Sequence, residues 1–215
     1  MKAIARLTFA ILVSGICLNL SAGRLWAQSI DGIKVGDKSS DAVRDHSPFS
    51  SSPPPRTGPP DAFLTLRWTQ PGGNSISFTT SPEDGRIVFI ESDWSGNSAN
   101  AATDVPGLSF GSSKLADIRE KFGSNGFGYK TNAMRSSGQE LVSINCYQFT
   151  ANQNLILALV TTLSIADVPT VSGKPKPDTG QGKLVAVMLA DQTYLQGIWG
   201  SDRIFDPKYQ PIEWK

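Results

Sequence analysis

A phrase of fifteen residues occurs almost twice in this chain, and it constrains the fold more than any other feature. "IDGIKVGDKSSDAVR" at residues 30–44 is followed 75 residues later by "VPGLSFGSSKLADIR" at residues 105–119. Three positions are identical in the two copies, namely Gly32 and Gly107, Gly36 and Gly111, and Arg44 and Arg119. A repeat of this kind predicts two similar structural units within one chain.

Each copy leads into a short segment with helical character, over residues 37–46 and 112–122. The second segment has the clearer apolar face, because Leu115, Ile118 and Phe122 fall at helical spacing. The pattern therefore predicts one helix at the start of each unit.

Segments that alternate between apolar and polar residues follow each predicted helix. In the first unit they lie at 64–68, 75–78 and 86–91 and predict an antiparallel meander of three strands. In the second unit, strands are predicted to begin at Phe127, Glu140 and Leu155.

The predicted fold class is α+β, with two tandem units that each contain a helix and an antiparallel sheet. The predicted divisions are a signal peptide at 1–27, a first unit at 28–94, a linker at 95–104, a second unit at 105–169, and a linker, extra strand and aromatic tail at 170–215. The polar, turn-forming composition of "SGNSANAATD" marks the boundary between the units.

The first 27 residues have the pattern of a secretory signal peptide. Lys2 and Arg6 precede an apolar run at 7–20, and "LWA" ends in a small residue at Ala27. Removing this segment takes three basic residues from the 20 in the chain and leaves 17 against 19 acidic ones, a formal net charge of −2. A chain of this charge has no basic footprint for nucleic acid, and we predict no membrane span after signal cleavage.

The repeated phrase resembles the motif of the small lipoprotein of the outer-membrane β-barrel assembly machinery, the SmpA/OmlA type. The resemblance covers residues 29–165 and rests on the two glycines, the helix and the strands that follow. Two such units in tandem are similar to the β-lactamase inhibitor protein fold. The resemblance implies protein binding without catalysis.

The chain offers few residues for catalysis, and we predict no enzyme, cofactor or metal site. Its one histidine, His46, and the one cysteine after the signal peptide, Cys146, cannot form the usual metal sites. Cys146 shares a strand face with apolar residues, so we expect it to be buried. Glu91 and Asp93 share a strand face and keep carboxylate chemistry open as an alternative, although solvated strand-end charges are the favoured interpretation.

Two stretches are candidates for partner binding. The segment 47–60 holds six prolines and includes Pro54 and Arg56, which predicts an extended surface loop. The C-terminal tail carries Trp199, Tyr209 and Trp214, and aromatic side chains of this kind are common at protein interfaces.

We therefore predict a non-enzymatic, exported protein-binding module of the bacterial envelope, either an assembly accessory or a hydrolase inhibitor. The partner is expected to be another envelope or secreted protein, and the location periplasmic or secreted. The alternative is a secreted hydrolase with carboxylate chemistry.

Overall fold

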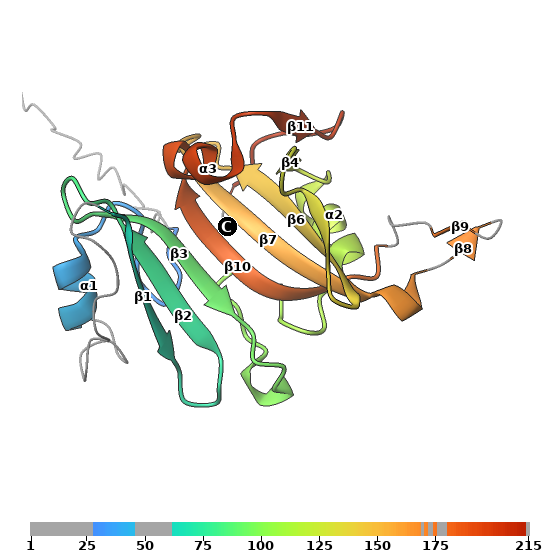
Figure 1. Cartoon of the computed structure of the whole chain (residues 1–215), viewed down its shortest axis with the longest axis horizontal. Coiled ribbons are helices and arrows are strands. Elements are labelled where there is room, and N and C mark those ends of the chain that lie inside the picture. The colour runs from blue at the N-terminus through green and yellow to red at the C-terminus, as the bar shows by residue number, and fades with distance from the viewer. Residues whose placement is uncertain (1–27, 46–61, 169, 172–173, 176–179, 214–215) are drawn as a thin grey trace, which may run out of the picture.

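One antiparallel sheet of nine strands organises the part of the chain that the computed structural model describes (Figure 1). That part comprises residues 28–45, 62–168, 170–171, 174–175 and 180–213, so the predicted signal peptide lies outside it. The strand order is β1-β2-β3-β10-β7-β6-β4-β11, and β5 pairs with β6 beside this path. The strands of the sheet are β1 (Leu64–Thr69), β2 (Ser75–Thr80), β3 (Ile87–Asp93), β4 (Phe127–Tyr129), β5 (Met134–Ser137), β6 (Glu140–Gln148), β7 (Leu155–Ser164), β10 (Lys183–Asp191) and β11 (Arg203–Phe205).

The other elements are short. The described helices are α1 (Ser39–Asp45), α2 (Leu115–Phe122) and α3 (Gln192–Trp199), with 3-10 helices η1 (Ser98–Asn100) and η2 (Ile165–Asp167). Strands β8 (Thr170–Val171) and β9 (Lys174–Pro175) form a small separate hairpin. The predicted helices at 37–46 and 112–122 and the predicted three-strand meander are confirmed by α1, α2 and β1 to β3.

The predicted fold class of two helix-plus-sheet units is wrong. The protein is β-rich, because a single continuous sheet takes in strands from both parts of the chain and the helices are few and short. Strand β10 decides this, since it pairs antiparallel with β3 on one side and with β7 on the other (Figure 1). The backbone groups at the edge of a strand need hydrogen-bond partners, and β10 supplies them to the edges of both β3 and β7.

The two copies of the phrase dock on the two strands that meet at the centre of this sheet. The backbone N–H of Gly36 donates to the carbonyl of Ile87 in β3 over 2.8 Å, and that of Gly111 donates to Leu184 in β10 over 2.8 Å. Both glycines have positive φ, 97° and 68°, which L-residues with a side chain rarely adopt. The two copies of the phrase thus make the same backbone contact with two neighbouring strands.

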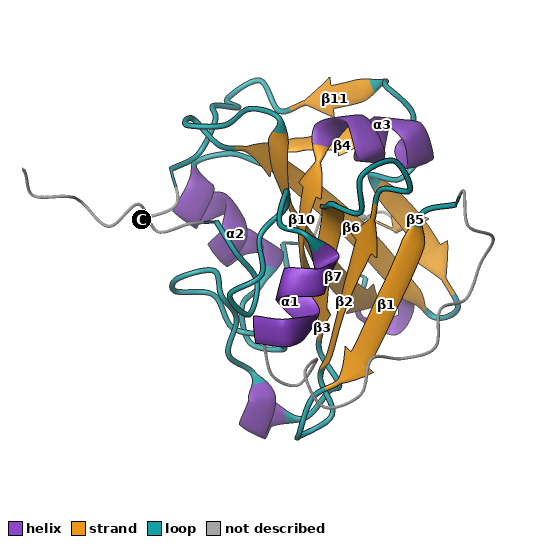
Figure 2. Ribbon diagram, turned by 90° about the vertical axis from the view of Figure 1, so that its left-hand side faces the viewer, coloured by secondary structure: helices purple, strands orange, loops and turns teal. Residues whose placement is uncertain are grey.

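The sheet has two different faces. Helices α1 and α2 cover the first face (Figure 2), where the larger apolar cluster includes Ala42, Phe78, Ile118 and Leu189. The second face carries a smaller cluster over β4, β6, β7 and β10, closed by Leu195 of α3. Cys146 is fully buried in this smaller cluster, which confirms the prediction from its strand register.

A side-chain cap begins helix α3. The Asp191 carboxylate accepts hydrogen bonds from the N–H groups of Thr193 and Tyr194, at 2.8 and 3.1 Å, and Gly200 follows the last residue. The tail beyond it returns to the sheet as β11 and through a bridge between Phe149 and Ile212. The described part of the aromatic tail is thus ordered against the sheet.

Candidate functional site

The second face of the sheet is polar over its first three strands. The polar side chains that point away from α1 and α2 here are Thr65, Arg67, Ser75, Ser77, Thr79, Glu91 and Asp93, which we call the polar face; the apolar Phe89 lies beside them, opposite Thr79. The strand register places them in cross-strand pairs, such as Arg67 opposite Ser77 and Ser75 opposite Asp93. On the next strands the same face is apolar, so the boundary runs between β3 and β10, where Glu91 opposes Met188.

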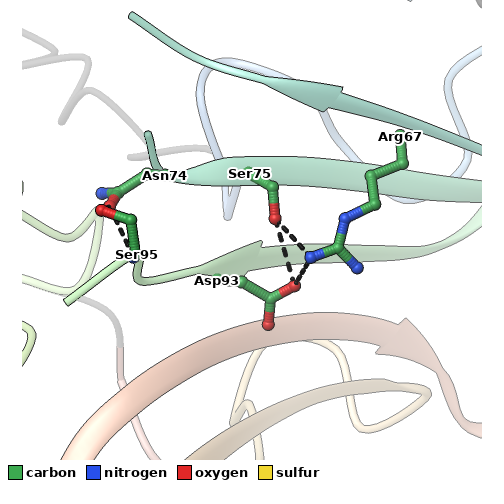
Figure 3. A network of polar contacts seen from close by, with 5 residues as sticks. All are labelled: Arg67, Asn74, Ser75, Asp93 and Ser95. Atoms are coloured by element: carbon green, nitrogen blue, oxygen red, sulfur yellow. Dashed lines mark hydrogen bonds and ion pairs between the residues drawn. The ribbon is translucent and has the colours of Figure 1, made fainter. Parts of the chain in front are cut away.

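Arg67, Ser75 and Asp93 form a compact network on the polar face (Figure 3). The Arg67 guanidinium donates to Ser75 Oγ over 2.6 Å and to Asp93 Oδ2 over 2.8 Å. Ser75 Oγ in turn donates to Asp93 Oδ2 over 3.3 Å. The network pairs the Asp93 carboxylate with the Arg67 guanidinium and orients that carboxylate along the face.

Glu91 lies beside this network and is the most perturbed acid of the polar face. Its pKa is raised from 4.5 to about 7, first by burial and then by the negative charge and hydrogen bonding of Asp93, while Arg67 acts in the opposite direction. The prediction that Glu91 and Asp93 share a face is confirmed by their common register on β3. The favoured interpretation of two solvated charges does not hold for Glu91, because this side chain is partly buried and burial is the first cause of its raised pKa.

The aromatic residues predicted to bind a partner mostly serve packing. The Trp199 ring lies 5.5 Å from the ring of Tyr129, and Tyr209 lies edge-on to Phe127 at 5.7 Å. The Tyr209 hydroxyl also accepts a hydrogen bond from the backbone N–H of Gln148 over 2.9 Å. Both predicted residues are therefore held in one aromatic cluster beside β4 and are only half-buried.

The other predicted binding residues, Pro54, Arg56 and Trp214, lie outside the described residues, as does His46. Among the described residues of the tail, the exposed large apolar side chains are three that were not predicted to bind a partner: Ile198, Ile204 and Phe205, with 50%, 61% and 43% of their surface exposed. Their only sequence signal is position in a short tail rich in apolar residues.

The exposed pair Ile204 and Phe205 belongs to β11, which is the last strand of the sheet and has one neighbour, β4. A pocket of about 350 Å³ opens beside it, with walls from α2, β4, β6 and β11. Its apolar side includes Phe127 and Ile144, and its polar side includes Asn125, Asn145 and Asp206. Hydrogen bonds from the N–H groups of Lys208 and Asn125 lower the pKa of Asp206, so this carboxylate is charged and held in place.

The described residues contain no group of three or more metal-ligating side chains. Burial raises the pKa of the Cys146 thiol far above its usual range, which makes it a poor nucleophile. In the same part of the chain, no helix is long and apolar enough to cross a membrane.

Comparison with known proteins does not identify a family. No family model matches the chain, and no curated protein matches it. Among solved structures, it is similar to an extracellular protein containing a SCP domain from Bacillus anthracis str. Ames, at 11% identity and a TM-score of 0.43. The match covers 98% of this chain and 57% of that one, so the chain spans little more than half the length of that protein. The resemblance to the SmpA/OmlA motif stays a prediction.

Proposed function

We propose that this protein is an exported, non-enzymatic module that binds another protein of the envelope or the secreted fraction along the β11 edge. The observation that carries the proposal is the exposure of Ile204 and Phe205 on a strand with one neighbour. Isolated apolar residues are common at surfaces, but here two adjacent ones lie on an edge strand beside a pocket.

An edge strand gives a partner two means of attachment. Its unpaired backbone N–H and C=O groups can extend the sheet by one strand, and the pocket beside Phe205 can receive a side chain. We therefore assign an extended segment of the partner to this edge. The signal-like residues 1–27 support export, and the SmpA/OmlA-like phrase supports a protein-binding role, as an assembly accessory or as a hydrolase inhibitor.

The test is site-specific cross-linking in the native cell, with a photoreactive residue at position 204 and a control at Ile165, which is 45% exposed on η2. We expect one defined protein to be captured from position 204 and not from 165. The purified chain should then bind that protein, and Ile204→Ser with Phe205→Ser should abolish binding while Ile165→Ser does not. Equal capture from both positions, or binding that survives the double substitution, contradicts the proposal.

A hydrolase is the second candidate, and the raised pKa of Glu91 favours it. A carboxylic acid with a pKa raised to about 7 is suited to general-acid catalysis, and Asp93 lies on the same face as a second carboxyl group that is paired with Arg67. Hydrolysis of any glycan or peptide substrate that is lost in both Glu91→Gln and Asp93→Asn would establish this function in place of the first.

A further inference from the structure

The hydrogen bonds between β11 and β4 determine which backbone groups of β11 face outward from the end of the sheet (Figure 1). The Asp202 carbonyl accepts from, and the Asp206 N–H donates to, the residues that flank β4, each over 2.9 Å. Because backbone groups alternate in direction along an antiparallel strand, positions 202, 204 and 206 face β4. The N–H and C=O groups of Arg203 and Phe205 therefore point away from β4, and they make no backbone hydrogen bond to other described residues.

The side chains of β11 alternate between the two faces of the sheet. Arg203 and Phe205 lie opposite two aromatic residues of β4 that belong to the smaller apolar cluster, so both are on the second face. Ile204 lies opposite Gly128, on the first face. A strand added to this edge would alternate in the same way, with its residues opposite Arg203 and Phe205 on the second face and the residue between them beside Ile204.

Arg203 places a held positive charge on this edge. Its guanidinium carbon lies 5.2 Å from the ring centres of both Phe127 and Phe205, and its Nη1 donates to Gln192 Oε1 over 3.3 Å. The ion pairs formed within the described part of the chain all involve other arginines, so none engages Arg203. A guanidinium carries several N–H donors, and most of those of Arg203 are thus available to a further acceptor.

We propose that the partner segment at this edge carries an aspartate or glutamate opposite Arg203, next to an apolar residue opposite Ile204. This role of Arg203 rests on the proposed function, because it requires a partner strand at β11. A carboxylate can accept two parallel hydrogen bonds from a guanidinium, and stacking on two rings orders Arg203 before the partner binds. The apolar neighbour would cover the exposed side chain of Ile204.

The direction of the segment follows from the sheet it extends. Every described strand pair of this sheet is antiparallel, and antiparallel pairing is slightly more stable per residue than parallel pairing. An antiparallel segment passes Phe205, Ile204 and Arg203 in that order. From its N-terminus it therefore reads apolar, apolar, acidic.

The test is NMR titration of the purified protein with three capped heptapeptides, Thr-Thr-Val-Ile-X-Thr-Thr, in which X is Glu, Gln or Lys. We expect affinity in the order Glu, Gln, Lys, with about fivefold between Glu and Gln, because hydrogen bonds between charged groups are stronger than those to a neutral amide. Binding should slow amide exchange at Arg203 and Phe205 but not at Ile204, whose N–H already faces β4. Arg203→Glu should reverse the order of the peptides, and Arg203→Gln should remove the difference between Glu and Gln.

The control is Lys208→Glu, which changes the net charge as much as Arg203→Glu does but at an exposed side chain beyond β11, and it should keep the order Glu, Gln, Lys. The three peptides on the unaltered protein test the role of Arg203 even if Arg203→Glu does not fold. Equal affinity of the three overturns that role, yet slowed exchange at Arg203 and Phe205 would leave the proposed function standing. Absence of binding by all three at millimolar concentration also overturns the role, and the proposed function then fails as well if position 204 captures no protein in the cell.

Discussion

Gly111 and Gly36 provide a matched pair of substitutions because they occupy equivalent positions in the two copies of the phrase. Both have φ in the left-handed region, so alanine at either site costs about 1–2 kcal/mol of folding free energy. At Gly36 no atom lies within 4 Å of the added Cβ, and we expect Gly36→Ala to cost only that amount.

At Gly111 the added Cβ also collides with the Trp94 ring, 2.6 Å from two of its carbons. Displacing a packed aromatic ring costs a further ~1–3 kcal/mol, so Gly111→Ala should cost about 2–5 kcal/mol in total. For a protein of this size, each kcal/mol lowers Tm by about 2–4 °C.

The assay is urea denaturation of the two variants and the parent, with the three slopes compared to confirm a common unfolded state. Gly111→Ala should be less stable than Gly36→Ala by about 1–3 kcal/mol, and its native tryptophan emission should change. Equal losses in the two variants would refute the reasoning, because they would show that Trp94 does not depend on the missing side chain at 111.

Three further predictions concern other parts of the structure. Glu91 keeps its proton in the folded protein up to about pH 7 but loses it near pH 4.5 in the unfolded chain. The free energy of unfolding should therefore fall by as much as about 3 kcal/mol as the pH rises through that window. In denaturation curves taken from pH 4 to 8, Glu91→Gln should remove this fall. Cys146 is fully buried with its thiol protonated, so native protein should react with thiol reagents only as fast as it opens, and rapid labelling would contradict the strand register. Ile204→Ser should change the melting temperature by less than a few degrees, since 61% of the surface of Ile204 is exposed, and a large loss in calorimetry would show that this residue is part of the core.

Local features of the structure follow closely from the sequence. Helical spacing predicted α2, and alternation predicted β1 to β3 and the burial of Cys146. These features depend on residues a few positions apart, whose propensities and caps act within one turn or one strand. The sequence alone is therefore sufficient to predict these features.

The candidate sites, in contrast, depend on contacts between residues that are far apart in the sequence. Burial is the first cause of the raised pKa of Glu91, and part of its surroundings, Met188, comes from β10, almost a hundred positions later. Exposure of Ile204 and Phe205 likewise follows from the position of β11 at the end of the sheet. No pattern within either segment distinguishes an edge strand from a central one.

The sequence by itself determined the helices, most strands and the repeated phrase with its glycines. Only the tertiary structure decided that β3 and β10 pair, which turns two predicted units into one sheet and places Trp94 against Gly111. The physical reason is that a strand can pair with any strand edge that has free backbone groups and a matching length and register. The choice among such edges depends on the packing of the whole chain.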